Sequence, residues 1–272
     1  MKIDLNEKVT RFLVQEYVNA IVNCHDKENR DYNLHKLIHT FQVVEVAKEL
    51  LQLTNPRLSS KLEKQVINAA VLHDVARCYE FKNGKKRKNF DHGKAGASLI
   101  EKEFPEMHIE QGCALWHNRM PTENDPVELQ PVLDYTRDAD ILGNIRYTVN
   151  HPIAYLSHIF NLFLPSDTSL NIDDEVQQSA LENRKCFYER LKKFEFIDMV
   201  VAQLIWILNL KTEAAFRLAK KENLFIRYRE LIVNQYIPKI NGTDEQRNKA
   251  KALILKLFPD SFFEQEFKKH GL

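Results

Sequence analysis

Apolar residues recur at helical spacing along most of this 272-residue chain, and this pattern constrains its fold more than any other feature. Side chains three and four positions apart share one face of an α-helix, whereas strict alternation is typical of a strand. Val43, Val46 and Leu50 form one such helical stripe. Glycine and proline, which punctuate turns and end helices, are scarce, at 7 and 9 residues. The sequence therefore predicts an all-α fold.

We expect a helical bundle with a C-terminal helical extension. The helices predicted for the bundle are, in chain order, 7–23, 34–53 after a polar break at 26–33, 60–77, one that begins at His92 after the N-cap Asp91, 106–118 and 126–145. The stretch 81–90, FKNGKKRKNF, is predicted to be a basic loop. A polar loop near residue 166 divides a region rich in His and Asp, 1–165, from the region 166–272. We interpret the second region as an extension packed on the same core.

Charge and cysteine content argue against several classes of protein. Lys and Arg number 39 and Asp and Glu 38, so the net charge of +1 does not favour a nucleic-acid duplex as partner. No pair among the four cysteines has C-x-x-C spacing, which favours reduced thiols. The most apolar stretch, 194–210, is too short and too polar to span a bilayer, and the first residues lack a signal-peptide pattern. We expect a cytoplasmic protein without a membrane partner. The sequence leaves open whether the protein forms a homodimer.

Ligand-type side chains lie on or beside apolar helix faces. His39 shares the face of Val43, and His73 lies on an alanine-rich stripe of its helix. Asp74 follows His73 and is set about 100° further round the helix. Asp140 lies on the last predicted helix of the bundle. Taken singly, each has an ordinary explanation, such as a core histidine, a helix cap or an ion pair.

Taken together, these side chains suit a metal ion. Buried carboxylates are unfavourable unless they are paired or bound to a metal. Two imidazoles and two carboxylates from three helices would compensate one another through one divalent cation. Nitrogen and oxygen ligands accept Mn²⁺, Fe, Co²⁺, Ni²⁺, Zn²⁺ or Mg²⁺, and the lack of thiolate ligands argues against a structural zinc site.

The order and the local sequence of these residues resemble the HD superfamily of metal-dependent phosphohydrolases. NLHKLIHTFQVVEVA is similar to the family's first-histidine helix, AAVLHDVAR to the helix that carries its His-Asp pair, and DYTRDADIL to its last-aspartate helix. The resemblance implies an HD-domain bundle in which His39, His73, Asp74 and Asp140 bind one metal ion. Asp138 is the alternative to Asp140, which stands in the family's Ala-Asp-x-Leu position.

Two further segments, DHGKAGASLI and ALWHN, resemble a subgroup that has two extra histidines, here His92 and His117. The resemblance leaves two roles open for them. They bind a second metal ion, with Asp74 bridging the two, or they bind phosphate and protonate the leaving group without a metal. The structural alternative for His92 is simply the start of a helix after its cap.

The activity that the resemblance implies is hydrolysis of a phosphate ester of a small molecule, such as a nucleotide, by a metal-bound hydroxide. Asp74 would ligate the metal and orient or deprotonate the water. Lys36 and Arg77 would bind the phosphate; many relatives have Lys at the position of Arg77, and Arg offers a flat two-pronged fork instead. The alternatives are an HD-type diiron oxygenase and a non-catalytic regulatory module that binds a nucleotide or phosphate.

Overall fold

The computed structural model describes residues 5–82, 85–87, 89–119, 125–151, 170, 174–182 and 196–272. The chain divides into two compact units, Met1–Asn144 and Ile145–Leu272, which we call unit 1 and unit 2 and describe separately. The division falls within helix α6 (Val132–Asn150). The boundary near residue 165 that the sequence predicts lies outside the described residues.

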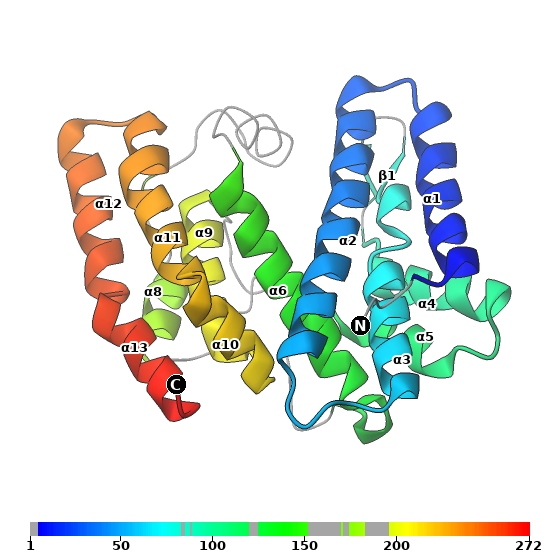
Figure 1. The fold of residues 1–272 in the computed structure, drawn as a ribbon. Coiled ribbons are helices and arrows are strands. Elements are labelled where there is room, and N and C mark those ends of the chain that lie inside the picture. The colour runs from blue at the N-terminus through cyan, green and yellow to red at the C-terminus, as the bar shows by residue number, and fades with distance from the viewer. Residues whose placement is uncertain are drawn as a thin grey trace. The chain divides into compact units, whose positions relative to one another are not determined.

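Unit 1 is a helical bundle, as the periodicity predicts (Figure 1). Its elements are α1 (Glu7–Val22), α2 (Lys27–Leu53), α3 (Ser60–Leu72), the 3₁₀ turn η1 (Arg77–Tyr79), strands β1 (Phe81–Lys82) and β2 (Lys85–Lys86), α4 (His92–Glu103), α5 (His108–Trp116), the 3₁₀ turn η2 (Val127–Leu129) and the first part of α6. Helices α1, α2 and α3 pack against one another, and α5 packs against both α3 and α4. Val43 and Leu50 are fully buried, so the predicted stripe of α2 faces the core.

Helix α2 is longer than the sequence predicts. It begins at Lys27, because the side chain of Asp26 accepts a hydrogen bond from the backbone N of Asn29 at 2.9 Å and caps the helix. The predicted polar break at 26–33 is therefore wrong. The polar residues of this first part of α2 are not merely solvated, since Asn29 and Asn33 are buried.

Helix α3 is shorter than predicted and ends at Leu72 instead of 77. Beyond it the backbone bonds to the third preceding residue: the N of Val75 donates to the carbonyl of Leu72, and the N of Arg77 donates to that of Asp74. The chain thus tightens into turns that lead into η1. The predicted basic loop that follows contains a short antiparallel pair, in which Phe81 is opposite Lys86.

Unit 2 is also helical over the residues that the structure describes. Its elements are the end of α6, α8 (Asp174–Leu181), α9 (Phe196–Ile205), the 3₁₀ turn η4 (Trp206–Asn209), α10 (Glu213–Lys221), α11 (Leu224–Leu231), the π-helix η5 (Ile232–Tyr236), the 3₁₀ turn η6 (Ile237–Lys239), α12 (Asp244–Leu257) and α13 (Asp260–Lys269). Helix α11 packs against α9, α10 and α13, and α12 packs against α8. Phe225, Phe258 and Phe263 form part of its core. None of the helices that the structure describes is long and apolar enough to cross a membrane.

Candidate metal centre

Two of the predicted site histidines lie just beyond the end of a helix. His73 follows α3 and His117 follows α5. The Nδ1 of His73 lies 2.7 Å from the carbonyl oxygen of Ala70, and the Nδ1 of His117 lies 2.8 Å from that of Ala114. A carbonyl only accepts hydrogen bonds, so each Nδ1 carries the proton and donates it, and satisfies a carbonyl that the helix end leaves unpaired. Each Nε2 is left with its lone pair.

His92 reaches the same place from the start of α4. The carboxylate of Asp91 caps this helix by accepting from the backbone N of Lys94 at 3.0 Å. The next residue is Gly93, where a Cβ atom would stand 2.9 Å from the carbonyl oxygen of Ala114. Only glycine permits this close approach of α4 to α5. The imidazoles of His92 and His117 consequently lie 5.3 Å apart, centre to centre.

The first cluster combines His39 from α2 with His73 and Asp74, and potential ligand atoms of these residues all lie within 4.8 Å of one another. Asp140 joins them from α6, with its Oδ1 2.9 Å from Nε2 of His39 and 3.9 Å from Nε2 of His73. Asp138 is fully buried on the same helix. Positions two apart on a helix point about 200° from each other, so Asp138 and Asp140 do not share a face. The structure thus brings His39, His73 and Asp74 together, with Asp140 as the fourth residue of the predicted set.

The second cluster shares Asp74 with the first. It consists of Asp74, His92 and His117, again with potential ligand atoms within 4.8 Å of one another. The Oδ1 atom of Asp74 lies 3.5 Å from Nε2 of His92 and 3.3 Å from Nε2 of His117. The two histidines that the sequence left without a settled role therefore meet the predicted centre through one carboxylate.

Charge at the centre is set by burial and by two cations. Burial alone would raise the pKa of the Asp74 carboxyl, but Arg77 and then Lys36 hold it well below its usual value. Burial lowers the pKa of His73 to about 4 and that of His92 to about 2. Near neutral pH the ionised carboxylate of Asp74 thus lies beside the neutral imidazoles of His73 and His92.

These residues fit a divalent metal ion. The Nε2 atoms of His73 and His92 are buried and have no hydrogen-bond partner among the described residues. The bare Nε2 of His73 faces carboxylate oxygens of Asp74 and Asp140 at 3.8 and 3.9 Å. A neutral lone pair turned toward a carboxylate is unfavourable unless a cation lies between them. Nitrogen and oxygen donors suit first-row divalent ions.

The two predicted phosphate-binding cations both lie beside Asp74. The Nζ atom of Lys36 is 3.6 Å from Oδ2 of Asp74, and Nε of Arg77 donates to Oδ1 at 3.2 Å. A second guanidinium nitrogen of Arg77, Nη1, donates to Glu80 at 3.0 Å. The side chains of Lys36 and Arg77 keep 15% and 24% of their surface exposed, so both remain at the rim of the centre.

Sequence reasoning missed several residues that support the centre. Tyr17 donates to the backbone carbonyl of Asp74 at 2.9 Å. Asn144 donates to Oδ1 of Asp140, also at 2.9 Å. The spacing of four residues on one helix would have indicated Asn144 as a neighbour. No local signal exists for Tyr17, which lies 57 positions before its partner.

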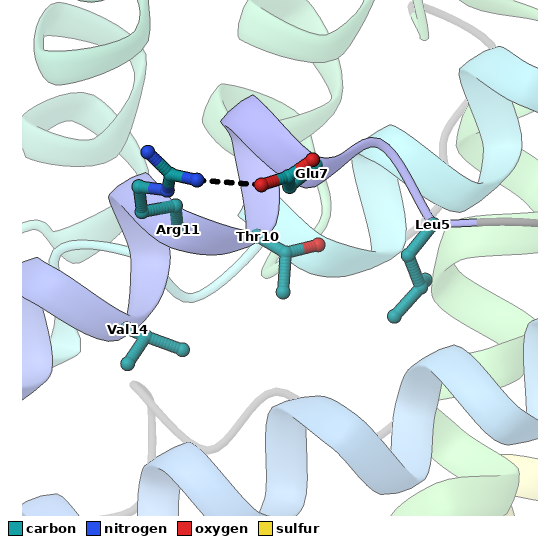
Figure 2. A pocket seen from close by; sticks show the side chains of 5 residues that line it. All are labelled: Leu5, Glu7, Thr10, Arg11 and Val14. Carbon is teal, nitrogen blue, oxygen red and sulfur yellow. Dashed lines mark hydrogen bonds and ion pairs between the residues drawn. The ribbon is translucent and has the colours of Figure 1, made fainter.

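A separate hollow lies along α1 (Figure 2). It has a volume of about 390 Å³ and is lined by Leu5, Glu7, Thr10, Arg11 and Val14. Its only charged pair drawn in the view is Arg11 with Glu7, at 2.5 Å, and both side chains are mostly exposed. It contains none of the predicted site residues, and we assign it no function.

Unit 1 is thus an all-α domain whose buried His and Asp side chains suit a divalent metal. A family model described as the HD domain matches residues 37–145. This part of the chain is similar to the HD domain, so the resemblance seen in the local sequence is confirmed over this range. No curated protein and no solved structure matches the chain.

Proposed function

We propose that unit 1 is a metal-dependent phosphohydrolase that cleaves a phosphate ester of a small molecule such as a nucleotide. HD domains are mostly metal-dependent hydrolases, which supports the class of reaction. The observation that carries the proposal is the surroundings of Asp74. Its carboxylate is common to both His-containing clusters and lies within 3.6 Å of two cations at the rim.

The ion would be held by His39, His73, Asp74 and Asp140. When bound, a divalent metal supplies a Lewis acid and lowers the pKa of a water ligand toward neutrality. Asp74 stays ionised because of its neighbouring cations, so its carboxylate would both help to hold the ion and orient or deprotonate the attacking water. Asp140 and His39 lie in contact, so these two side chains would hold the ion together.

The substrate phosphate would lie against Lys36 and Arg77. Phosphoryl transfer places charge on the equatorial oxygens, and fixed cations stabilise that charge without reorganising during the reaction. Arg77 contributes directed N–H donors and Lys36 a compact point charge, so the two play different parts. A pair of cations at the rim favours an anionic substrate.

The role of His92 and His117 follows from the second cluster. His92 Nε2 is buried, has no hydrogen-bond partner among the described residues and lies 3.5 Å from Asp74. This geometry supports a second metal ion, which Asp74, His92 and His117 would hold, more than the metal-free role of binding phosphate and protonating the leaving group. Two ions about 3.5–4 Å apart would hold both the attacking and the leaving oxygen.

The shared carboxylate also favours one rival function, a diiron oxygenase on the same scaffold. That reaction would require two irons and would consume oxygen with an organic substrate. The rim cations favour the hydrolase, because an uncharged organic substrate has no use for both. Oxygen uptake by the iron-loaded protein without phosphate release would favour the oxygenase.

A phosphate-release screen tests the proposal. The purified protein is assayed with Mn²⁺, Mg²⁺, Ni²⁺ or Fe²⁺ on a panel of nucleotides and sugar phosphates. We expect hydrolysis of at least one phosphate ester, and we expect Asp74→Asn to lower its rate by more than the roughly 10–100-fold typical of outer-sphere changes.

Asp140→Asn and Asp138→Asn provide a matched pair for this screen, because the two aspartates lie two positions apart on α6. The first variant should lose activity and the second should keep it. Full activity of Asp74→Asn would contradict the proposal, and loss of activity in Asp138→Asn alone would make Asp138 the last ligand.

A further inference from the structure

Glu80 is a buried carboxylate that belongs to neither metal cluster. Only 3% of its surface is exposed. A buried carboxylate is unfavourable unless it is paired and hydrogen-bonded. Among its partners are two described side chains: its Oε2 accepts from the hydroxyl of Tyr32 and, at 3.0 Å, from Nη1 of Arg77. The carboxylate therefore connects α2 to the cation at the rim of the centre.

The backbone of η1 sets the pairing of Glu80 with Arg77. The N of Glu80 donates to the carbonyl of Arg77 at 3.0 Å, which closes a 3₁₀ turn. In a 3₁₀ turn, side chains three positions apart lie one above the other. Tyr32 approaches from α2, where its ring also packs against Phe81 with an edge-to-face geometry at 4.8 Å. Arg77, Glu80 and Tyr32 are thus positioned by two separate elements of unit 1, the turn η1 and helix α2.

Arg77 is shared between two carboxylates. Its Nε donates to Asp74 and its Nη1 to Glu80, which fixes the plane of the guanidinium. Its third nitrogen, Nη2, makes no hydrogen bond with any residue that the structure describes. Arg77 thus keeps one set of donors for a ligand while its other nitrogens are held in place.

Without Glu80, the guanidinium of Arg77 would favour a different arrangement of hydrogen bonds. Arginine pairs with a single carboxylate most strongly through two parallel hydrogen bonds. Asp74 would then take two nitrogens of Arg77 in place of one. Such a pair would turn donors away from the substrate and compete with the metal for the oxygens of Asp74. Glu80 prevents this rearrangement because it accepts a hydrogen bond from Nη1 on the other side of the guanidinium.

We propose that Glu80 and Tyr32 are positioning residues, which hold Arg77 so that Nη2 faces the phosphate of the substrate. The inference rests on the proposed function, because it assigns the phosphate to Arg77. It adds two residues that lie outside both metal clusters. Tyr32 acts through Glu80, and Glu80 acts through Arg77.

The test measures kinetics and phosphate binding in Glu80→Gln and Tyr32→Phe. We expect Glu80→Gln to raise the KM for a phosphate ester, and the Kd for inorganic phosphate measured by calorimetry, by about tenfold. Tyr32→Phe should act in the same direction with a smaller change. Metal content should stay the same in both variants. The matched control is Glu63→Gln, which alters another buried carboxylate of unit 1, on α3, and should change none of these values.

A double-mutant cycle separates positioning from a general effect on the fold. If Glu80 acts through Arg77, Glu80→Gln should have almost no further effect on phosphate binding in an Arg77→Ala background. Additive effects would overturn the inference, as would an unchanged KM and Kd in Glu80→Gln. Phosphate binding that depends on Glu80 in a protein that hydrolyses no ester would support the positioning and refute the proposed function. Hydrolysis that is indifferent to Glu80 would do the reverse.

Discussion

The two units of this protein bury their polar groups in different ways. In unit 1, acids, imidazoles and cations lie around Asp74, and they come from residues on or just beyond α2, α3, α4, α5 and α6 and from η1. In unit 2, the core described by the structure is built from aromatic and aliphatic side chains such as Phe225 and Phe263. Both sets of His and Asp found to suit a metal, among the described residues, belong to unit 1.

Arg229 shows how unit 2 treats a buried charge. This guanidinium is 6% exposed, and it donates to the backbone carbonyl of Phe258 at 2.9 Å and pairs with Asp260 at 2.6 Å. The Asp260 side chain itself is 66% exposed. The buried charge of Arg229 is thus paired with a carboxylate at the surface, whereas the charged groups of unit 1 lie close together in its interior. Burial of several charged groups at one place is unfavourable unless they are paired or bind a metal ion. The cluster of charged groups in unit 1 therefore indicates a functional site.

The largest expected effect that sharpens this contrast is on stability. Phe263→Ala should lower the free energy of unfolding by about 3–5 kcal/mol, because it leaves a cavity in the aromatic core of unit 2. Metal content per folded molecule should not change. Denaturant unfolding and elemental analysis of the same sample measure both. A folded Phe263→Ala protein that has lost its metal would break the contrast between the units.

A second prediction uses the two tryptophans, one in each unit: Trp116 ends α5 and Trp206 begins η4. Metal binding should stabilise the unit that contains the ligands by about 2.7 kcal/mol when the metal concentration is 100 times its Kd. In a Trp206→Phe protein, the fluorescence of Trp116 should report this shift of the unfolding midpoint on addition of metal.

The complementary Trp116→Phe protein, in which Trp206 reports on unit 2, should show a smaller shift or none. Equal shifts for both reporters would show that the metal stabilises the two units as one, and would break the comparison at this point.

The smallest of these effects concerns Asn144, whose side chain donates to Oδ1 of Asp140. Groups that orient a metal ligand typically contribute about 10–100-fold to metal affinity. We expect Asn144→Ala to raise the metal Kd within that range in a competition titration with a chelator. Asn150, further along the same helix, accepts from Arg227 in unit 2, so Asn150→Ala is the control and should leave the Kd unchanged. An unaltered Kd in Asn144→Ala would remove Asn144 from the centre.

Features of the fold that depend on nearby residues could be predicted from the sequence. The stripe of Val43 and Leu50 predicts the buried face of α2, and Asp91 predicts the start of α4 at His92. The end of α3 could not be predicted in this way. The helical pattern continues past Leu72, while the backbone changes to tighter hydrogen bonds that periodicity does not detect.

The sequence predicts those residues of the centre that belong to motifs resembling the HD family. His39 and Asp140, which are 101 positions apart, were placed together by resemblance to the HD family, and the structure brings them into contact. Their role as metal ligands stays a prediction. The link between Tyr32 and Glu80 spans 48 positions and follows no motif, so only the packing of α2 against η1 reveals it.

Metal content of the purified protein tests the central claim most directly. Wild-type protein and Asp74→Ala are dialysed side by side against the same metal-containing buffer, and bound metal per folded chain is measured by elemental analysis. The account predicts at least one divalent ion in the wild type and a fall to background in the variant, because Asp74 takes part in both clusters. Equal metal content in the two proteins would contradict it.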